Sequence, residues 1–383
     1  MLSFYNSKKL EFWAIYVFFT SMYNFTMNNK LSEYLNKIEQ ALNVYLPEKN
    51  NFNWQKLSFN ELNEAVSSSL IENLITPCKN LMSLGGKRWR PLLLVLCSEL
   101  ARQSGFSEGL SLEESCNLTP LVEFVHTASL IHDDIEDGAD TRRGKPAAHI
   151  TYGLDTAIIA GSWLYFEATT CIEALNCSVE LKKILYSLYS QELRRLHLGQ
   201  AMDIFWHRNP SVFPSLKEYS AMVQCKTGTL ASLAVQAGLI AGGVSQEIAA
   251  QGGKLAAKLG EGFQIIDDVQ NLTTGNPGKK RGDDIVEGKK SLPVLIHLES
   301  EPNDTQKIAR LFEKAQKEGI ESCAVEEAIR LLESKGAILK ASELGKKCVK
   351  ENSYALANLF ETANKSEAAK LILELFEGML PNA

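Results

Sequence analysis

Acidic side chains crowd the segment SLIHDDIEDGAD, which contains Asp133, Asp134, Glu136 and Asp137. Asp133 and Asp137 are four residues apart, so a helix would place them on one face, one turn apart. The apolar residues before this segment predict that the helix is buried, and no cation on the same helix is placed to neutralise the acids. Buried carboxylates without compensation are costly, so we expect a bound cation here.

A second cluster repeats the pattern in FQIIDDVQNL, with Asp267, Asp268 and Asn271. Both clusters read D-D-x-x-(D/N), follow an apolar run and precede a basic segment. Carboxylate and amide oxygens are the ligands that Mg²⁺ prefers, usually together with water and substrate phosphate. Either cluster alone is also compatible with a solvated helix end, but the repeated pattern favours two acidic helix segments that face each other around Mg²⁺.

Basic residues accompany both clusters. The segment LMSLGGKRWRP supplies Lys87, Arg88 and Arg90 immediately before a helix that we expect to begin at Pro91, and a helix N-terminus adds positive charge. Further cations lie in QCKTGTL and in the segments after the acids: Arg142, Arg143, Lys226, Lys279, Lys280, Lys289 and Lys290. Any one of them is also typical of a solvated surface. Their distribution favours two phosphorylated ligands, one held through Mg²⁺ and one held directly by Lys and Arg.

The elements that must position these groups are helices. Apolar residues recur every three or four positions from residue 31 onward, and no alternating strand pattern bounded by hairpin turns is present. Long helices are predicted over residues 92–102, 112–135, 154–176, 179–205, 216–242 and 246–272. Segments such as TLASLAVQAGLIAGG are apolar on most faces, and their small residues favour close helix packing. We therefore predict one large all-α bundle; the polar segment 273–290 is typical of a binding loop.

Composition limits the functional classes. The chain has 383 residues with 40 Lys and Arg against 46 Asp and Glu, a net charge of −6. Such a surface does not attract nucleic acid, so none is expected as a partner. The eight cysteines are scattered without a CxxC pair, which favours reduced thiols in a cytoplasmic protein over disulfides or a zinc site.

The first 30 residues differ from the rest, because LEFWAIYVFFTSMYNF is strongly hydrophobic. Its uncharged run is shorter than the ~20 residues that span a bilayer comfortably. A signal peptide, a weak membrane anchor, a dispensable extension and a translation start at Met27 all remain open, and the last two are favoured. We therefore divide the chain into a hydrophobic extension, 1–30, and a helical domain, 31–383.

Taken in order, these motifs resemble those of the trans-isoprenyl diphosphate synthases. GGKRWRP, DDIED with RRGKP, KTG, FQIIDD, GKKRGDD and EGK are similar to the family's motifs from about residue 80 to 298. DDIED, LHLGQAMDIFW and DDVQN resemble the animal and fungal type of geranylgeranyl diphosphate synthase. The resemblance implies an all-α homodimer, or a higher oligomer, of the isoprenoid synthase fold with a deep central cavity. It also implies Mg²⁺-dependent 1′-4 condensation of isopentenyl diphosphate with dimethylallyl, geranyl or farnesyl diphosphate.

The resemblance also implies roles for individual residues. The Mg²⁺ ligands would be Asp133, Asp134, Asp137, Asp267 and Asp268, which would be catalytic together with Lys226. Isopentenyl diphosphate would be held by Lys87, Arg90, His126 and Arg143. The allylic substrate would contact Arg142, Lys226, Thr227, Gln264, Lys279 and Lys289. His126 is also compatible with an ordinary core histidine, and Asn271 departs from the commonest family pattern, which has a third acid there.

Product length depends on the side chains one helical turn before Asp133, which are Ala128 and Ser129. One turn is about 5 Å, close to one isoprene unit, so small residues here disfavour a fifteen-carbon product and allow twenty carbons or more. The floor of the cavity must come from other helices. Candidates, which are also compatible with plain core, are Tyr165, Phe166, Phe205 and Trp206.

Three other functions were weighed. A longer-chain polyprenyl diphosphate synthase also suits the small residues, although LHLGQAMDIFW favours the shorter class. A terpene cyclase would not need the Gly-Gly-Lys-Arg motif for a second substrate. A non-catalytic regulatory subunit would be expected to have lost acids or lysines, and nearly all are present.

Overall fold

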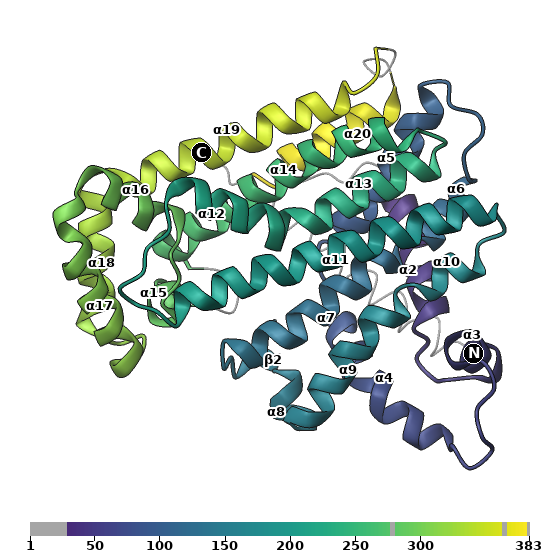
Figure 1. Ribbon diagram of the computed structural model, residues 1–383, viewed down its shortest axis with the longest axis horizontal. Helices are drawn as coiled ribbons and strands as arrows, with labels where there is room; N and C mark the ends of the chain where they lie inside the picture. Colours follow the sequence, from purple (N-terminus) through teal and green to yellow (C-terminus); the bar gives the residue numbers. More distant parts are fainter. Residues whose placement is uncertain (1–28, 276–279, 362–365, 381–383) are drawn as a thin grey trace.

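The structure, a computed structural model, describes residues 29–275, 280–361 and 366–380. They form a helical bundle, which confirms the predicted all-α class (Figure 1). The first half contains α2 (Asn29–Tyr45), α3 (Phe52–Phe59), α4 (Ser68–Ser83), α5 (Trp89–Gln103), α6 (Leu112–Asn117), α7 (Pro120–Glu136), α8 (Ala148–Tyr152), α9 (Leu154–Glu167) and α10 (Thr170–Ala174). The second half contains α11 (Val179–His207), α12 (Leu216–Val223), η1 (Gln224–Gly228), α13 (Thr229–Ala241), α14 (Gln246–Thr273), α15 (Asp283–Glu287), α16 (Leu292–Ser300), η2 (Pro302–Asp304), α17 (Thr305–Glu318), α18 (Cys323–Ser334), α19 (Ala337–Ala357) and α20 (Glu367–Glu377).

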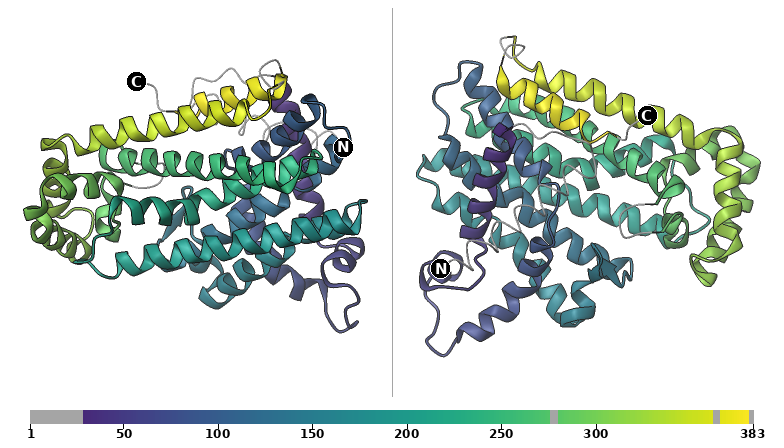
Figure 2. Two further views of the ribbon diagram at one scale, coloured as in Figure 1. Left: turned by 45° about the horizontal axis from the view of Figure 1, so that its top comes forward. Right: turned by 180° about the vertical axis from the view of Figure 1, so that it is seen from behind.

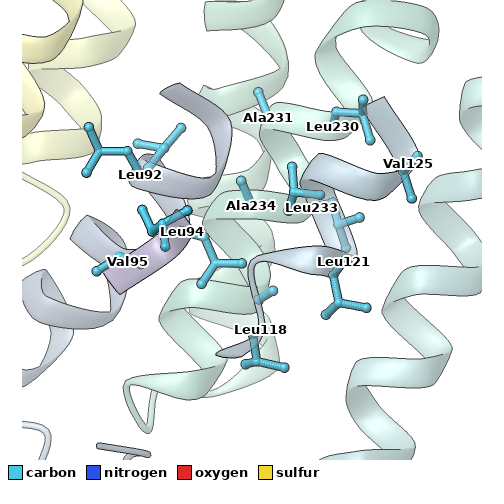
Figure 3. Close-up of a cluster of buried hydrophobic side chains, with 14 of the residues drawn as sticks. Leu92, Leu94, Val95, Leu118, Leu121, Val125, Leu230, Ala231, Leu233 and Ala234 are labelled. Carbon is cyan, nitrogen blue, oxygen red and sulfur yellow. The ribbon is translucent and has the colours of Figure 1, made fainter. Parts of the chain in front are cut away.

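The core lies where α5, α7 and α13 meet. Leu92, Leu121 and Leu233, one from each helix, are buried in a single apolar cluster (Figure 3). Burying each such side chain contributes about 1.5–3 kcal/mol relative to exposure. Gly238 of α13 lies against the carbonyl of Leu94 with no room for a β-carbon, so the predicted close packing of this small-residue helix is confirmed.

Long helices run side by side through the molecule. In order across the bundle they are α11, α13, α14 and α19, and each packs against the next (Figures 1 and 2). Helices α7 and α9 pack against each other, while α17 and α18 form a separate pair at one end. Residues far apart in sequence are thereby held on a rigid frame, which is what a site assembled from several helices requires.

Three of the predicted helices are interrupted. The helix expected over 112–135 is two helices, because Pro120 lacks a backbone N–H and begins α7. The helix expected over 154–176 breaks between α9 and α10. The helix expected over 216–242 contains the π-helical turn Gln224–Gly228, which carries the KTG motif. Helix α5 begins at Trp89, two residues before the predicted start.

One short hairpin lies outside the helical pattern. β1 (Thr141–Arg142) pairs antiparallel with β2 (Lys145–Pro146). The two residues between them, Arg143 and Gly144, have φ of 52° and 75°, values typical of the tight turns that join antiparallel strands. The hairpin folds the RRGK segment back toward α7, whose C-terminal turn carries the first acidic cluster.

The polar segment 273–290 was expected to be a loop, but it contains the short helix α15 within its described part. Residues 1–28, which make up nearly all of the predicted hydrophobic extension, lie outside the described residues. Within the described ranges, no helix combines the length and apolar character needed to cross a membrane.

Candidate active site

The first acidic cluster occupies the C-terminal end of α7. Asp133 lies in the last turn, and the Asp137 N–H closes the helix by donating to the Asp133 carbonyl at 2.9 Å. The Asp134 carboxylate is buried and accepts a 2.8 Å hydrogen bond from Nε of Arg142 on the hairpin. Its Oδ2 has no hydrogen-bond partner among the residues that the structure describes. Burial raises the pKa of both Asp133 and Asp134, so ionising this cluster requires compensating positive charge.

Helix α11 lies across from this cluster and supplies partners that the sequence reasoning missed. Gln200 donates to Asp133 at 2.7 Å and also contacts Glu136. Asp203, one turn later, lies 2.6 Å from the Lys226 Nζ and 2.7 Å from the His207 ring. Burial favours the neutral form of Asp203, but Lys226 and His207 outweigh it and hold its pKa below the usual range.

The π-helical turn brings Lys226 toward the first cluster. Gly199 of α11 lies against the Lys226 backbone with no space for a β-carbon, so the two segments approach closely only because this position is glycine. Asp203 and Asp133 raise the pKa of Lys226 against the effect of burial, so the side chain stays charged. Gly199, Gln200 and Asp203 belong to LHLGQAMDIFW, which the sequence analysis used only for classification.

The second acidic cluster lies on α14, two turns before the helix ends. The Asp268 carboxylate accepts hydrogen bonds from the Tyr219 hydroxyl at 2.7 Å, the Leu292 N–H at 3.0 Å and the Gln264 amide at 3.1 Å. Burial, followed by the nearby Asp284 carboxylate, raises the pKa of Asp268 to about 7. Gln264 also accepts from Thr227 at 2.9 Å, so two residues assigned to the allylic substrate contact each other.

Asn271 and Asp267 lie on the same helix but have different surroundings. The fully buried Asn271 side chain accepts the Asp284 N–H at 3.2 Å and so fixes the start of α15. Burial raises the pKa of Asp267, while Lys87 and Arg90 act in the opposite direction. Asp267 therefore faces the basic GGKRWRP segment.

Lys289 links the first acidic cluster to α15. Its Nζ lies 3.9 Å from Asp137 at the end of α7 and 3.4 Å from Asp284 on α15, and it also pairs with Glu287. These acids outweigh burial and raise the pKa of Lys289 well above its usual value. One ammonium group thus joins the end of the first cluster to α15, and Asn271 of the second cluster holds the start of that helix. Asp284 and Glu287 were missed from the sequence, although both follow GKKRG closely.

A separate basic group surrounds His126. Burial, followed by Arg90, Arg143 and Arg88, lowers the pKa of His126 well below its usual value, so its imidazole is neutral. The Arg90 guanidinium lies 4.4 Å from the Trp89 ring, and its Nε has no hydrogen-bond partner in the described part of the chain. Burial lowers the pKa of Arg90 to about 10. Positive charge therefore exceeds negative charge here, which is the environment that a bound anion stabilises.

Comparison with known proteins identifies the family in which this arrangement of acidic and basic residues occurs. Residues 71–331 match the polyprenyl synthetase family, and the match includes both acidic clusters, the π-helical turn and the basic segment. The chain belongs to the polyprenyl synthetase family. It is therefore a prenyl diphosphate synthase, as the motifs predicted.

Its relatives in the family differ in product. A geranylgeranyl pyrophosphate synthase of Penicillium crustosum is 32% identical over 78% of this chain and 82% of its own length. Solanesyl diphosphate synthase 2 of Arabidopsis thaliana is 31% identical over 75% of this chain and 65% of its own length. The crystal structure of geranylgeranyl pyrophosphate synthetase from Pyrococcus horikoshii superposes with a TM-score of 0.76 at 27% identity, covering 93% of this chain and 98% of that one.

The donor set fits a hard divalent ion that keeps other ligands. In the described part of the chain, no three His, Cys, Asp or Glu side chains converge closely enough to hold a metal alone. The acids instead lie on two helices, and burial raises the pKa of Asp133, Asp134, Asp267 and Asp268, so their ionised forms lack full compensation. Mg²⁺ commonly takes one or two carboxylates and completes its shell with water and substrate phosphate.

The residues assigned to product length lie on α7, α9 and α11. Ala128 is fully buried and Ser129 is partly buried in this prenyl synthase. The Tyr165 ring on α9 lies 5.6 Å from the His132 ring of α7 and 5.3 Å from the His197 ring of α11, so it closes the space between these helices. Two other floor candidates do not point inward: the exposed fractions are 76% for Phe166 and 55% for Phe205. Trp206 is buried in a cluster with Tyr219 and Met222.

Lys279, which the resemblance assigns to the allylic substrate, lies outside the described residues.

Proposed function

We propose that this prenyl diphosphate synthase is a Mg²⁺-dependent enzyme that condenses isopentenyl diphosphate with an allylic diphosphate, 1′ to 4, and forms geranylgeranyl diphosphate. One observation carries the proposal: Lys289 joins the first acidic cluster to α15, which Asn271 of the second cluster holds, while a separate arginine group surrounds the neutral His126. Two differently built anion sites fit two diphosphate substrates. Dimethylallyl, geranyl and farnesyl diphosphate are the allylic substrates that the family resemblance implies.

The chemistry follows from the charges around the two acidic clusters, Lys226 and Lys289, which together form the acidic half of the site. Asp133, Asp137 and Asp267 would hold Mg²⁺, which supplies positive charge to the departing diphosphate. Lys226 and Lys289 stay protonated beside these acids and add charge where the leaving group develops it. The allylic C–O bond breaks with its electron pair on the diphosphate, and the double bond of isopentenyl diphosphate then forms the new C–C bond. A C–H bond beside the resulting cation supplies the electrons of a new double bond, and the released diphosphate accepts that proton.

The cations around His126, which form the basic half of the site, would hold the second substrate in place. Lys87, Arg90 and Arg143 would bind the isopentenyl diphosphate directly, because Arg forks match phosphate oxygens in a fixed geometry. Neutral His126 can donate one hydrogen bond without adding charge. Asp267, which lies between this group and the acidic half, would join the two sites.

The product assignment rests on the residues around Tyr165. Small Ala128 leaves room below Asp133, while the Tyr165 ring between α7 and α11 would limit the growing chain. A twenty-carbon product fits this combination. A longer-chain synthase is the second candidate, because the solanesyl synthase relative is nearly as similar to this chain as the geranylgeranyl synthase.

We also propose a homodimer in the cytoplasm. Ile159 and Phe166 on α9 and Leu198 and Phe205 on the neighbouring α11 are exposed, and apolar side chains of this size on adjacent helices are typical of a subunit interface. A second copy of the chain would cover them. All eight cysteines are unpaired, which suits a reducing compartment.

The test is a product assay. Purified enzyme is incubated with Mg²⁺, labelled isopentenyl diphosphate and each allylic starter, and the chains are sized after dephosphorylation. We expect a dominant twenty-carbon product that Asp133→Ala abolishes and that the matched control Glu180→Ala, an exposed acid on α11, leaves unchanged. A ladder to thirty carbons or more would assign the longer-chain class. No product with any starter would instead support the regulatory subunit.

A further inference from the structure

Arg88 has an unusual backbone for its residue type. It is the N-cap of α5 and adopts left-handed angles, φ 46° and ψ 23°, which are unfavourable for a residue with a β-carbon. Such strain persists where the surroundings hold the residue firmly, and it concentrates at functional sites. Lys87, directly before Arg88, and Arg90, two residues after it, are proposed ligands of isopentenyl diphosphate.

The Arg88 side chain is held at all three guanidinium nitrogens. Nε donates to Glu39 on α2 at 2.7 Å, and Nη1 donates to Glu123 on α7 at 2.7 Å. Nη2 donates to the Met82 carbonyl at the end of α4 at 2.9 Å. The side chain is 6% exposed, so these contacts are shielded from solvent. One guanidinium therefore ties three helices to the loop that carries the basic motif.

The other arginines of the group are arranged differently. A β-carbon at Gly86 would lie 3.1 Å from Nη2 of Arg143 and 3.2 Å from Nη1 of Arg88, so both guanidinium groups close around the loop. Arg88 alone takes up the buried Glu123 carboxylate in a direct ion pair at 2.7 Å among the described contacts. Without that pair, Glu123 would place a negative charge beside the arginines that are meant to receive a diphosphate.

We propose that Arg88 is a positioning residue: held by Glu39 and Glu123, it fixes the loop so that Lys87 and Arg90 can reach isopentenyl diphosphate. Helix α2, remote in sequence from every motif of the site, is thereby part of the machinery for that substrate. The proposal rests on the proposed function, because it assumes that the basic group binds isopentenyl diphosphate.

Steady-state kinetics with each substrate varied in turn test this role. Glu39→Gln weakens one arm of the anchor by removing its charge at a half-buried position. Arg88→Lys keeps the charge but cannot reproduce the planar, three-nitrogen geometry of the guanidinium contacts. We expect KM for isopentenyl diphosphate to rise about three- to tenfold in Glu39→Gln and about tenfold or more in Arg88→Lys, because small displacements of binding groups weaken binding strongly. The KM of the allylic substrate and kcat should stay within about twofold, since the acidic half is unchanged.

The matched control is Glu33→Gln, which lies on the same helix and pairs with Lys30 and Lys37 on the surface. If Glu39→Gln has the same kinetics as Glu33→Gln, the positioning role is wrong. An equal rise in both KM values would also overturn it, because that result indicates general loosening. Thermal melting identifies a variant that fails to fold, and if Arg88→Lys does so, Glu39→Gln decides the question.

A third variant separates this proposal from the proposed function. Lys87→Ala removes an assigned ligand rather than its support. If Lys87→Ala raises KM for isopentenyl diphosphate and Glu39→Gln does not, only the positioning role fails. If Lys87→Ala leaves that KM unchanged, the assignment of the basic group to isopentenyl diphosphate fails, whatever Glu39→Gln does.

Discussion

Asp134 and Asp268 hold the same place in the two acidic motifs but are stabilised by different chemistry. Asp134 pairs with the Arg142 guanidinium, whereas Asp268 is hydrogen-bonded by the neutral groups of Tyr219, Gln264 and the Leu292 N–H. Both carboxylates are almost fully buried. Protein partners thus hold the second acid of each motif, although Oδ2 of Asp134 has none among the described residues. The first acid, Asp133 or Asp267, is the better candidate ligand for Mg²⁺.

The third position of each motif widens this difference. Asp137 ends α7 and lies 3.9 Å from Lys289, with part of its side chain exposed. Asn271 is fully buried within α14 and holds the Asp284 backbone at the start of α15. The first cluster therefore sits at a helix end beside a hairpin, where it can adjust to a substrate. The second, in the last two turns of α14, is fixed by contacts with α12, α15 and α16.

The largest effect should distinguish the first and second acids of one motif. Asp133→Asn should lower kcat about 10²–10³-fold, the loss typical of one preorganised electrostatic contact, while the melting temperature of the metal-free enzyme changes little. Asp134→Asn should instead destabilise the fold by about 1–3 kcal/mol, because Arg142 loses a buried charged partner. Kinetics and urea unfolding of both variants measure the two effects. Equal destabilisation by both substitutions would contradict the division between ligand and anchor.

How far the sequence predicted this site depends on the interaction concerned. The acids of the two motifs, Lys226, Lys289 and the arginines were singled out because their types and spacing are local patterns in the sequence, whereas Asp203, Asp284 and Glu287 were not. The roles of Asn271 and Arg88 were not predicted, because each is set by a partner from a distant segment, Asp284 for one and Glu39 for the other. The helix breaks were also missed. The break at Pro120 was predictable in principle, because the effect of proline on a helix is local.

The π-helical turn shows the same limit. QCKTGTL contains no proline, and a single glycine, Gly228, does not by itself interrupt a helix. The turn is stabilised by close contacts with α11 and α14. The fold class, in contrast, needed only the apolar period and the absence of strand patterns.

A moderate effect is expected in the pH dependence of the free energy of unfolding. There a buried acid outside the site, Glu167, can be compared with Asp268 inside it. Glu167, outside the site, accepts hydrogen bonds from Ser58 at 2.7 Å and Trp54 at 3.2 Å, and burial raises its pKa to about 8. A raised pKa in the folded state stabilises the fold below the unfolded value, near 4.5, and that stability is lost as pH rises through about 8. Glu167→Gln keeps the acceptor oxygen and should be about 1–3 kcal/mol more stable than wild type at pH 8.5, and nearly equal at pH 5.

Urea unfolding across pH 5–9 measures this change. In Glu167→Gln, a decline in stability should remain as pH rises toward 7, because burial also raises the pKa of the cluster acids Asp133, Asp134, Asp267 and Asp268. Mg²⁺ should reduce this decline if the clusters bind the ion. If Glu167→Gln is less stable than wild type at every pH, the charge of Glu167 stabilises the fold. Glu167 and Asp268 would then not be comparable as buried acids whose ionisation destabilises the protein.

The smallest effect should come from making the second motif resemble the first. Asn271→Asp keeps an oxygen for the Asp284 N–H but adds a carboxylate near Asp268 and Asp284, so the metal-free enzyme should lose about 1 kcal/mol of unfolding free energy at pH 8. Mg²⁺ should restore most of that loss, and kcat should stay within about twofold, because Asp267 is unchanged. The control is Asn303→Asp, where an exposed residue receives the same change. If Mg²⁺ restores none of the lost unfolding free energy, the side chain at position 271 contacts only α15 and not the ion. The third positions of the two motifs would then differ in function as well as in their protein contacts.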